Sequence, residues 1–342
     1  MREYTQIELL IIDLDNTLYD WISFFVPAFY RMIDVAVEIL QVDRETLLTD
    51  IQKVHQKYGN SEHPFALLET GAAINRFPGK NRAELAKILD PAFHAFNKKR
   101  KELLRLFPGV FETLKFINES GCTVVAHTEA DVLNSLFRIN ALGIRQFLSY
   151  LYAPRSEGLG HPEGKVLYAD ELKNGFLRLL PREHRKPSPK VLEDIFVEYS
   201  LSPMNVLYVG DSITKDISMA KRAGAHAAWA RYGTLYDKTL WEKLVRVTHW
   251  TAEDVARESQ LRNEAEGVLP DVNLESFTEL TDHYEFGIAP YEVSEPTRDA
   301  AEPAFNRFGS KILSGFPGFQ IKEKFIHQKT FMNSGYKEAP VK

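Results

Sequence analysis

The feature that most constrains the fold is a run of four apolar residues, Leu9 to Ile12, that leads directly into two carboxylates, Asp13 and Asp15. A short unbroken run of Leu and Ile is typical of a strand that is buried on both faces, as in a parallel sheet covered by helices. Two carboxylates at the end of such a strand are costly to bury unless another group compensates their charge. The stretch therefore predicts a buried parallel strand with a compensated acidic site at its end.

Four later segments repeat the pattern of a short apolar run followed by a helical pattern. Strands that alternate with helices predict βαβ units. The expected fold class is therefore α/β, with a doubly wound, Rossmann-like and mostly parallel sheet as its core. The four further strands are expected at 123–127, 150–153, 205–210 and 225–230.

The interval between the first two predicted strands is far longer than the later ones. Residues 13–122 carry apolar side chains at helical spacing, as in Phe25, Val26 and Phe29, and little strand signal. We predict a helical cap domain inserted into the α/β core, and an irregular extension after the core. The predicted boundaries are 1–19 with 106–285 for the discontinuous core, 20–105 for the cap and 286–342 for the C-terminal extension.

The C-terminal part of the chain is divided by charge. Residues 251–303 hold fourteen Asp or Glu and three Arg, whereas residues 304–342 hold seven Lys or Arg and two Glu. Opposite charges would allow the last segment to fold back on the acidic one. Proline and glycine residues interrupt any regular pattern there, so a partly disordered tail explains the composition equally well.

Composition excludes several classes of protein. A net charge of −5 argues against a general nucleic-acid binder, and the single cysteine, Cys122, allows no intrachain disulfide. The chain has no apolar run of about 18 residues, which a membrane-spanning helix needs. Its first residues also lack the pattern of a signal peptide. We therefore expect a cytoplasmic protein without a membrane span, and the oligomeric state stays open.

Asp13 and Asp15 have the spacing of a catalytic pair. Residues two apart in a strand point the same way, so both carboxylates can reach one small volume. Two close carboxylates split their proton affinities, so one can act as a nucleophile while the other holds a proton. A calcium loop also begins with this pattern, but Leu18 and Phe24 occupy the positions where such a loop needs Gly and Glu.

A second acidic cluster, Asp211 and Asp216, follows the strand predicted at 205–210. The carboxyl ends of parallel strands lie on the same rim of a sheet, so Asp211 and Asp13 are expected to lie close together. Two or three carboxylates there form a hard oxygen site of the kind that Mg²⁺ prefers, and Mg²⁺ also binds substrate phosphate. Taken alone, Asp211 could instead be only a helix N-cap.

A hydroxyl and a cation are expected near this rim. Thr128 ends the second predicted strand, where its hydroxyl could hold a phosphate oxygen. Lys186 precedes Ser188 and Pro189, a good N-cap and a good first residue of a helix. Its ammonium could neutralise both a phosphate and Asp13. In isolation, a strand-end hydroxyl and a solvated surface charge are the ordinary explanations of these two residues.

Taken together, the four motifs resemble those of the haloacid dehalogenase-like hydrolase superfamily, phosphatase type. They are "DLDNT" at 13–17, "VVAHT" at 124–128, "KPSP" at 186–189 and "GDSITKD" at 210–216, in the family's order. The resemblance covers about residues 1–235 and is specific because all four motifs occur together. It implies an α/β core with a helical cap between the first two motifs. It also implies a Mg²⁺-dependent phosphatase that acts on a small phosphorylated metabolite.

The resemblance also assigns roles to the residues of these motifs. Asp13 would be the nucleophile that forms an aspartyl phosphate, and Asp15 would protonate the leaving alcohol and then activate water. Thr128 would bind a nonbridging phosphate oxygen. The implied Mg²⁺ ligands are Asp13, Asp211 and the backbone carbonyl of Asp15; Asp216 is the supporting residue, and Lys186 binds phosphate.

Two features depart from the family pattern. Glu129 follows Thr128, where many relatives carry a small or amide residue. A carboxylate beside a phosphate is unfavourable unless it points away or meets a cationic part of the substrate. An insertion near 155–177 lies between the second and third motifs, where it could serve as a second lid or decorate the surface.

Three alternatives remain open. A dehalogenase of the same superfamily would need neither Mg²⁺ nor Asp15. A phosphonate hydrolase would need a Schiff-base lysine from the cap, for which Lys53 or Lys57 would serve. From a different class, the chain could be a non-catalytic regulatory or scaffold module that binds partners through its tail. The intact acidic set and Lys186 favour the phosphatase over all three.

Overall fold

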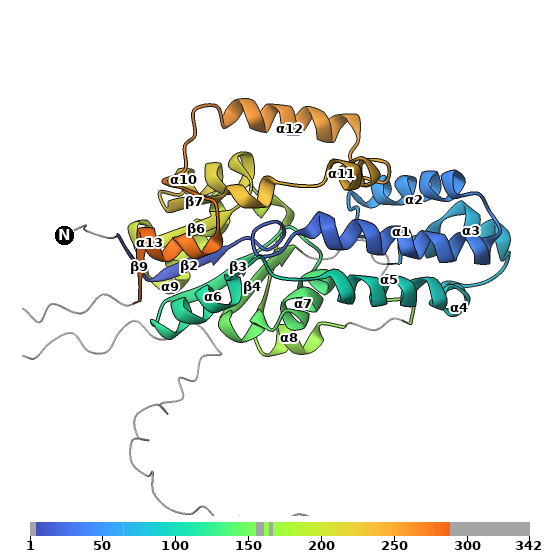
Figure 1. The fold of residues 1–342 in the computed structure, drawn as a ribbon, viewed down its shortest axis with the longest axis horizontal. Coiled ribbons are helices and arrows are strands. Elements are labelled where there is room, and N and C mark those ends of the chain that lie inside the picture. The colour runs from blue at the N-terminus through green and yellow to red at the C-terminus, as the bar shows by residue number, and fades with distance from the viewer. Residues whose placement is uncertain (1–4, 64, 155–160, 164–166, 288–342) are drawn as a thin grey trace, which may run out of the picture. The chain divides into compact units, whose positions relative to one another are not determined.

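The computed structural model describes residues 5–63, 65–154, 161–163 and 167–287. Its central feature is a seven-stranded sheet in the order β5-β4-β3-β2-β6-β7-β8 (Figure 1). Every neighbouring pair in this sheet is parallel, so the predicted doubly wound α/β core is confirmed. The strands are β2 (Leu9–Ile12), β3 (Thr123–His127), β4 (Tyr150–Pro154), β5 (Leu177–Leu180), β6 (Val206–Gly210), β7 (His226–Ala230) and β8 (Val272–Leu274).

The apolar run near the start of the chain forms the middle strand, β2, and all four of its residues are buried. Leu10 and Ile12 belong to one apolar core, and Leu9 and Ile11 belong to another. Because helices cover both faces of the strand, every position in β2 must be apolar rather than every second one. The first core includes residues of α6 (Val110–Glu119) and α7 (Val132–Ala141), and the second includes residues of α9 (Lys190–Tyr199) and α10 (Ser218–Arg222).

The order of the strands decides where a ligand can bind. The chain begins the sheet in its middle with β2, adds β3, β4 and β5 on one side, and then returns to add β6, β7 and β8 on the other. The direction of winding therefore reverses beside β2, and ligands of open α/β sheets bind at such a point. A separate two-stranded parallel sheet pairs β1 (Thr5–Ile7) with β9 (Tyr284–Phe286).

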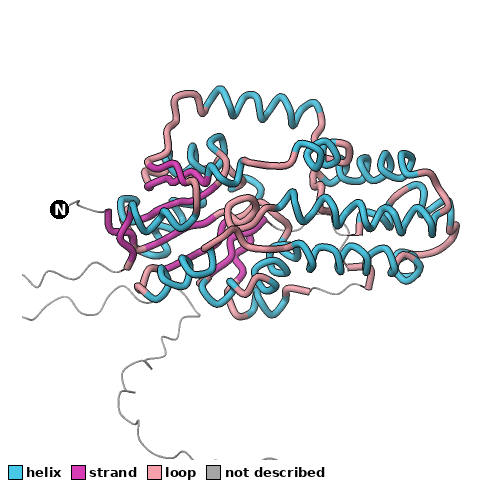
Figure 2. The backbone as a smooth tube through the Cα atoms, viewed as in Figure 1, coloured by secondary structure: helices cyan, strands magenta, loops and turns pink. Residues whose placement is uncertain are grey.

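The predicted helical cap is present between β2 and β3. Apart from residue 64, this interval is described, and it contains helices and turns but no strand of the sheet (Figure 2). The first cap helix begins after Asp20, whose carboxylate accepts a hydrogen bond from the N–H of Ser23 at 2.9 Å. The exact boundaries at 20 and 105 remain a prediction. The helices are α1 (Trp21–Leu40), α2 (Arg44–Tyr58), α3 (Gly71–Arg76), α4 (Arg82–Ile88) and α5 (Asp90–Leu103).

Two helices between β7 and β8 were not predicted from the sequence, α11 (Lys238–Val245) and α12 (Ala252–Glu264). We call residues 238–264 the bridge segment, because this part of the core's chain contacts the cap. Helix α11 packs against α1. Arg246 also pairs with Glu45 of α2, with 3.0 Å between Nη2 and Oε2.

Two predicted segments lie partly outside the described residues. The insertion near 155–177 is described only in part, and that part includes α8 (Ala169–Lys173) and leads into β5, which the sequence analysis did not predict. The extension at 286–342 is described only at 286 and 287. The last described helix is α13 (Leu280–His283). Within the described part of the chain, no helix combines the length and the apolarity needed to cross a bilayer.

Candidate active site

Three carboxylates gather at the rim of the sheet where β2 and β6 end. Asp13 follows β2, Asp211 follows β6, and Asp216 comes five residues later. One carboxylate oxygen of each residue lies within 4.8 Å of the other two. The backbone N–H of Asp13 donates to the carbonyl of Val209 at 2.9 Å, so the pairing of β2 with β6 continues into the site. The structure thus brings together the acidic residues that the sequence places after these two strands.

Lys186 supplies a cation to this cluster. Its Nζ contacts a carboxylate oxygen of Asp13 and lies 2.8 Å from Oδ1 of Asp216. The side chain of Lys186 is 3% exposed, so water screens these contacts little. Burial lowers the pKa of Lys186, but Asp13 and Asp216 outweigh this effect and raise the pKa well above its ordinary value. The ammonium therefore stays charged in the folded protein.

Asp216 reaches the cluster from a short π-helix, Ile213–Ile217. Its carboxylate accepts hydrogen bonds from the N–H of Ser212 at 3.0 Å and from the hydroxyl of Tyr208 at 3.2 Å. Gly210 makes this position possible, because a Cβ atom there would lie 2.4 Å from the carboxylate carbon of Asp216. The glycine of the "GDSITKD" motif is thus required by the close approach of Asp216.

The three carboxylates carry more negative charge than one lysine neutralises. Burial raises the pKa of Asp13 to about 7; Lys186 opposes the rise and Asp216 adds to it. Burial, together with Asp13 and Asp216, also raises the pKa of Asp211 well above its ordinary value. A cluster of carboxylate oxygens that repel one another suits a hard divalent cation. The residues at this rim therefore fit Mg²⁺.

Thr128 and Glu129 follow β3 and point to different partners. The Thr128 Oγ1 accepts a hydrogen bond from the N–H of Ala130 at 3.0 Å, which leaves its hydroxyl proton for another acceptor. The Glu129 carboxylate instead pairs with Lys215, with 3.6 Å between Nζ and Oε2. A lysine of the protein thus offsets the negative charge that the sequence places beside Thr128.

Asp15 is paired with a different cation, Arg138 of α7. The two carboxylate oxygens of Asp15 lie 2.7 and 3.0 Å from Nη1 of Arg138. Sequence reasoning missed Arg138, although a charged residue between the buried Leu136 and Ile139 was a signal of a paired charge inside the protein. The metal contact predicted for the backbone carbonyl of Asp15 stays a prediction.

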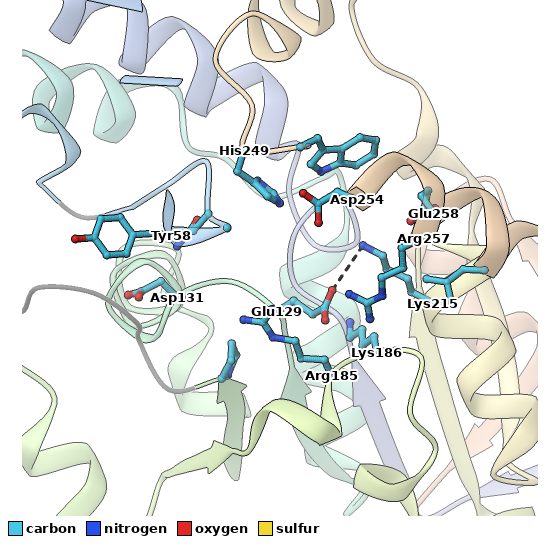
Figure 3. A pocket seen from close by; sticks show the side chains of 15 residues that line it. Tyr58, Glu129, Asp131, Arg185, Lys186, Lys215, His249, Asp254, Arg257 and Glu258 are labelled. Carbon is cyan, nitrogen blue, oxygen red and sulfur yellow. Dashed lines mark ion pairs between the residues drawn. The ribbon is translucent and has the colours of Figure 1, made fainter. Parts of the chain in front are cut away.

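A pocket of about 260 Å³ opens beside Lys186. Three parts of the chain form its walls: the cap at 58–60, the core around Glu129, and the bridge segment around His249 (Figure 3). Figure 3 shows that charged side chains from the core and the bridge segment surround the same space. Cations and carboxylates balance in number there, which suits a polar ligand. The charged lining residues are Arg185, Lys186, Lys215, Arg257, Glu129, Asp131, Asp254 and Glu258.

The parallel sheet, the acidic rim and the inserted cap together define a hydrolase class. The model of the haloacid dehalogenase-like hydrolase family matches residues 7–224, which is more than half of the chain. The chain belongs to the haloacid dehalogenase-like hydrolase family. The resemblance stated from the four motifs is therefore confirmed.

Similar proteins of known sequence and structure were found at low identity. Glyceraldehyde 3-phosphate phosphatase of Methanopyrus kandleri is 26% identical over 236 residues, which cover 68% of this chain and 87% of that protein. The protein of the same name from Pyrococcus abyssi is 23% identical and covers 66% and 82%. The solved 2-haloacid dehalogenase of Pseudomonas syringae pv. Tomato DC3000 is 18% identical, with a TM-score of 0.47, and covers 81% of this chain and 97% of that one.

Proposed function

We propose that this chain is a Mg²⁺-dependent phosphatase that hydrolyses a small phosphomonoester through an aspartyl phosphate on Asp13. The observation that carries the proposal is the convergence of three rim carboxylates with the buried Lys186. Catalysis of phosphoryl transfer depends mainly on positioning and on neutralisation of charge. These residues supply a nucleophile, oxygen ligands and a fixed cation within one small volume.

The comparisons support a phosphate ester as the substrate. The matched relatives of known sequence are phosphatases by name. A dehalogenase would need a nucleophilic carboxylate but no further acidic cluster at the rim. Lys53 and Lys57, the lysines considered for a phosphonate hydrolase, have exposed side chains that pair with Asp50 and Glu69. Neither lysine is among the residues that line the pocket beside Lys186.

In the first step, a carboxylate oxygen of Asp13 attacks the phosphorus atom, and the bond from phosphorus to the leaving oxygen breaks. Asp15 donates a proton to that oxygen, so the leaving group departs as an alcohol. Lys186 offsets the charge of the phosphate and of Asp13, and the hydroxyl of Thr128 donates to a nonbridging oxygen. Lys186 needs little reorganisation, because Asp216 already holds its ammonium group.

In the second step, water attacks the phosphorus of the aspartyl phosphate. Asp15 takes a proton from the water as its oxygen bonds to phosphorus, and the bond between phosphorus and Asp13 breaks. Inorganic phosphate leaves, and both carboxylates return to their starting states. Asp13, Asp211 and the backbone carbonyl of Asp15 would hold Mg²⁺, which when bound supplies further neutralisation of the phosphate and carboxylate charges.

Hydrolysis of p-nitrophenyl phosphate tests the proposal. We expect the reaction to require Mg²⁺ and to vanish in Asp13→Asn, because an amide oxygen is a poor nucleophile and carries no charge for the metal. The matched control is Asp34→Asn, which removes a charge from an exposed ion pair with Arg44 and should keep the wild-type rate. Turnover that persists in Asp13→Asn without metal contradicts the mechanism. A panel of phosphorylated metabolites then identifies the substrate.

A further inference from the structure

A single arginine connects the proposed acid–base residue to the cap. Nη1 of Arg138 contacts both carboxylate oxygens of Asp15, at 2.7 and 3.0 Å. Nη2 of the same guanidinium contacts both carboxylate oxygens of Glu62, with 2.5 Å to Oε2. Asp15 follows the central strand, Arg138 belongs to α7 of the core, and Glu62 lies in the cap after α2. Three parts of the molecule thus meet on one planar group.

The guanidinium has little freedom to move. Its side chain is 2% exposed, and its central carbon lies 5.2 Å from the centre of the Phe24 ring. Burial lowers the pKa of Arg138, but Asp15 and Glu62 outweigh this effect, so the pKa is raised and the group stays charged. A rigid fork with fixed charge sets the positions of the groups that accept from it.

Both α7 and the bridge segment form hydrogen bonds with the cap segment that carries Glu62. The side-chain amide of Asn134, also on α7, donates to the backbone carbonyl of Glu62 at 3.3 Å. The hydroxyl of Ser61 accepts from the backbone N–H of His249 at 3.0 Å, and its Oγ lies 2.8 Å from Nδ1 of the same residue. The core and the bridge segment therefore hold this part of the cap against α7.

Only one member of the Asp15–Arg138–Glu62 triad faces solvent to a substantial degree. The side chain of Asp15 is 25% exposed, whereas those of Arg138 and Glu62 are 2% and 11% exposed. Arg138 makes one contact with each oxygen of Asp15, and a carboxylate oxygen has two lone pairs, so each oxygen retains one lone pair that Arg138 does not use. Of the three charged groups, Asp15 alone is therefore open to a ligand or to water, whereas Arg138 and Glu62 are enclosed behind it.

We infer that Arg138 positions Asp15, and that Glu62 of the cap holds Arg138 in place. Asp15 is thereby aligned for proton transfer, and the same contacts hold the cap segment on α7. The inference rests on the proposed function, in which Asp15 gives a proton to the leaving oxygen and later takes one from water. Without the Glu62 charge, the guanidinium loses its second anchor. The alignment of Asp15 then degrades, although Asp13 and Lys186 remain in place.

The substitution Glu62→Gln, assayed with p-nitrophenyl phosphate in the full chain with Mg²⁺, separates the two steps. Nitrophenolate is a good leaving group that needs no proton, so formation of the aspartyl phosphate should continue. Attack of water needs Asp15 as a base, and general-base catalysis typically contributes a factor of about 10²–10⁴. We expect a burst of one nitrophenolate per enzyme, followed by steady turnover that is reduced about 10- to 100-fold.

A second substrate and a matched control sharpen the test. Hydrolysis of an alkyl phosphate, glycerol 2-phosphate, should lose rate already in the first step, because its alkoxide must be protonated as it leaves. The control is Glu45→Gln, which breaks another ion pair of the cap, that with Arg246 of the bridge segment, at a place that does not reach Asp15. Glu45→Gln should show no burst, and any change in its rate should be the same for both substrates.

Several results would overturn the inference. Wild-type turnover in Glu62→Gln would show that Glu62 does not influence Asp15. An equal loss of rate for both substrates without a burst would show the same. If Glu62→Gln does not fold, as judged by thermal unfolding, Glu62→Asp carries the same test, because it keeps the charge but shortens the reach to Arg138. A wild-type enzyme that hydrolyses no phosphomonoester would instead refute the proposed function, and the inference with it.

Discussion

The inner and outer ends of the site are built differently. At the inner end, Asp13, Asp216 and Lys186 are buried, and the contacts of Lys186 with the two carboxylates join them. At the outer end, Arg185 and Arg257 are exposed, and neither pairs with a carboxylate within the described part of the chain. Residues that depend on one another should lose function together, whereas independent exposed residues should each contribute little. We therefore expect chemistry to depend on the inner end and substrate choice on the outer end.

The largest effect is expected from Lys186→Met. The change leaves two buried carboxylates without their shared cation and removes a preorganised charge from the phosphate. Loss of one preorganised group of this kind costs about 10²–10³-fold in kcat, which steady-state assays with saturating Mg²⁺ would measure. Lys190→Met, on the exposed face of α9, is the control and should keep the wild-type kcat. A loss of less than about tenfold would show that the inner residues do not act as a unit.

Mg²⁺ should stabilise the folded protein, and this stabilisation should depend on residues of the inner end and not on those of the outer end. Binding relieves the repulsion that raises the pKa values of Asp13 and Asp211. At a free concentration of about 100 Kd, a single site adds about 2.7 kcal/mol to the free energy of unfolding. Urea unfolding with and without MgCl₂ measures this increment. It should disappear in Asp211→Asn and persist in Glu129→Gln; the same increment in all three proteins would place the metal elsewhere.

The sequence predicted the inner end better than the outer end, for a physical reason. Asp13 and Asp211 directly follow buried strands, and strand order alone brings the ends of β2 and β6 together. The contact between Glu62 and Arg138 spans 76 positions and depends on how the cap sits on α7, which no local pattern encodes. The bridge segment was missed for a similar reason, because α12 is polar along most of its length and shows little of the apolar periodicity that reveals a buried helix.

Acid should weaken one of the contacts that hold the bridge segment against the cap. His55 of α2 is buried, and its Nδ1 lies 2.6 Å from the carbonyl of Val247 in the bridge segment. Burial lowers the pKa of His55 from 6.5 to about 4. Between these values the unfolded chain binds a proton that the folded chain does not. The contribution of His55 to the free energy of unfolding is therefore fully present above pH 6.5 and is lost as the pH falls toward 4.

Urea unfolding at pH 7 and pH 5 measures this loss. The drop in the free energy of unfolding that is due to His55 should be about 2 kcal/mol. Other histidines contribute to the total pH dependence, so the informative quantity is the difference between the wild type and His55→Gln. The variant should show a pH dependence smaller by that amount. Equal pH dependence of the two proteins would mean that His55 does not titrate in this way.

The smallest effect is expected from Arg257→Ala, at the outer wall. An exposed charge contributes about 0.2–1 kcal/mol to an interaction, which corresponds to a rise in KM of up to about fivefold for the substrate that the metabolite panel identifies. The value of kcat should not change, because Arg257 is not part of the Asp13–Lys186–Asp216 cluster and would bind the ground state and the transition state equally. Arg262→Ala alters the same helix outside the lining of this pocket and should change neither constant. If Arg257→Ala lowers kcat instead, the outer wall takes part in the transition state, and the division between the two ends of the site fails.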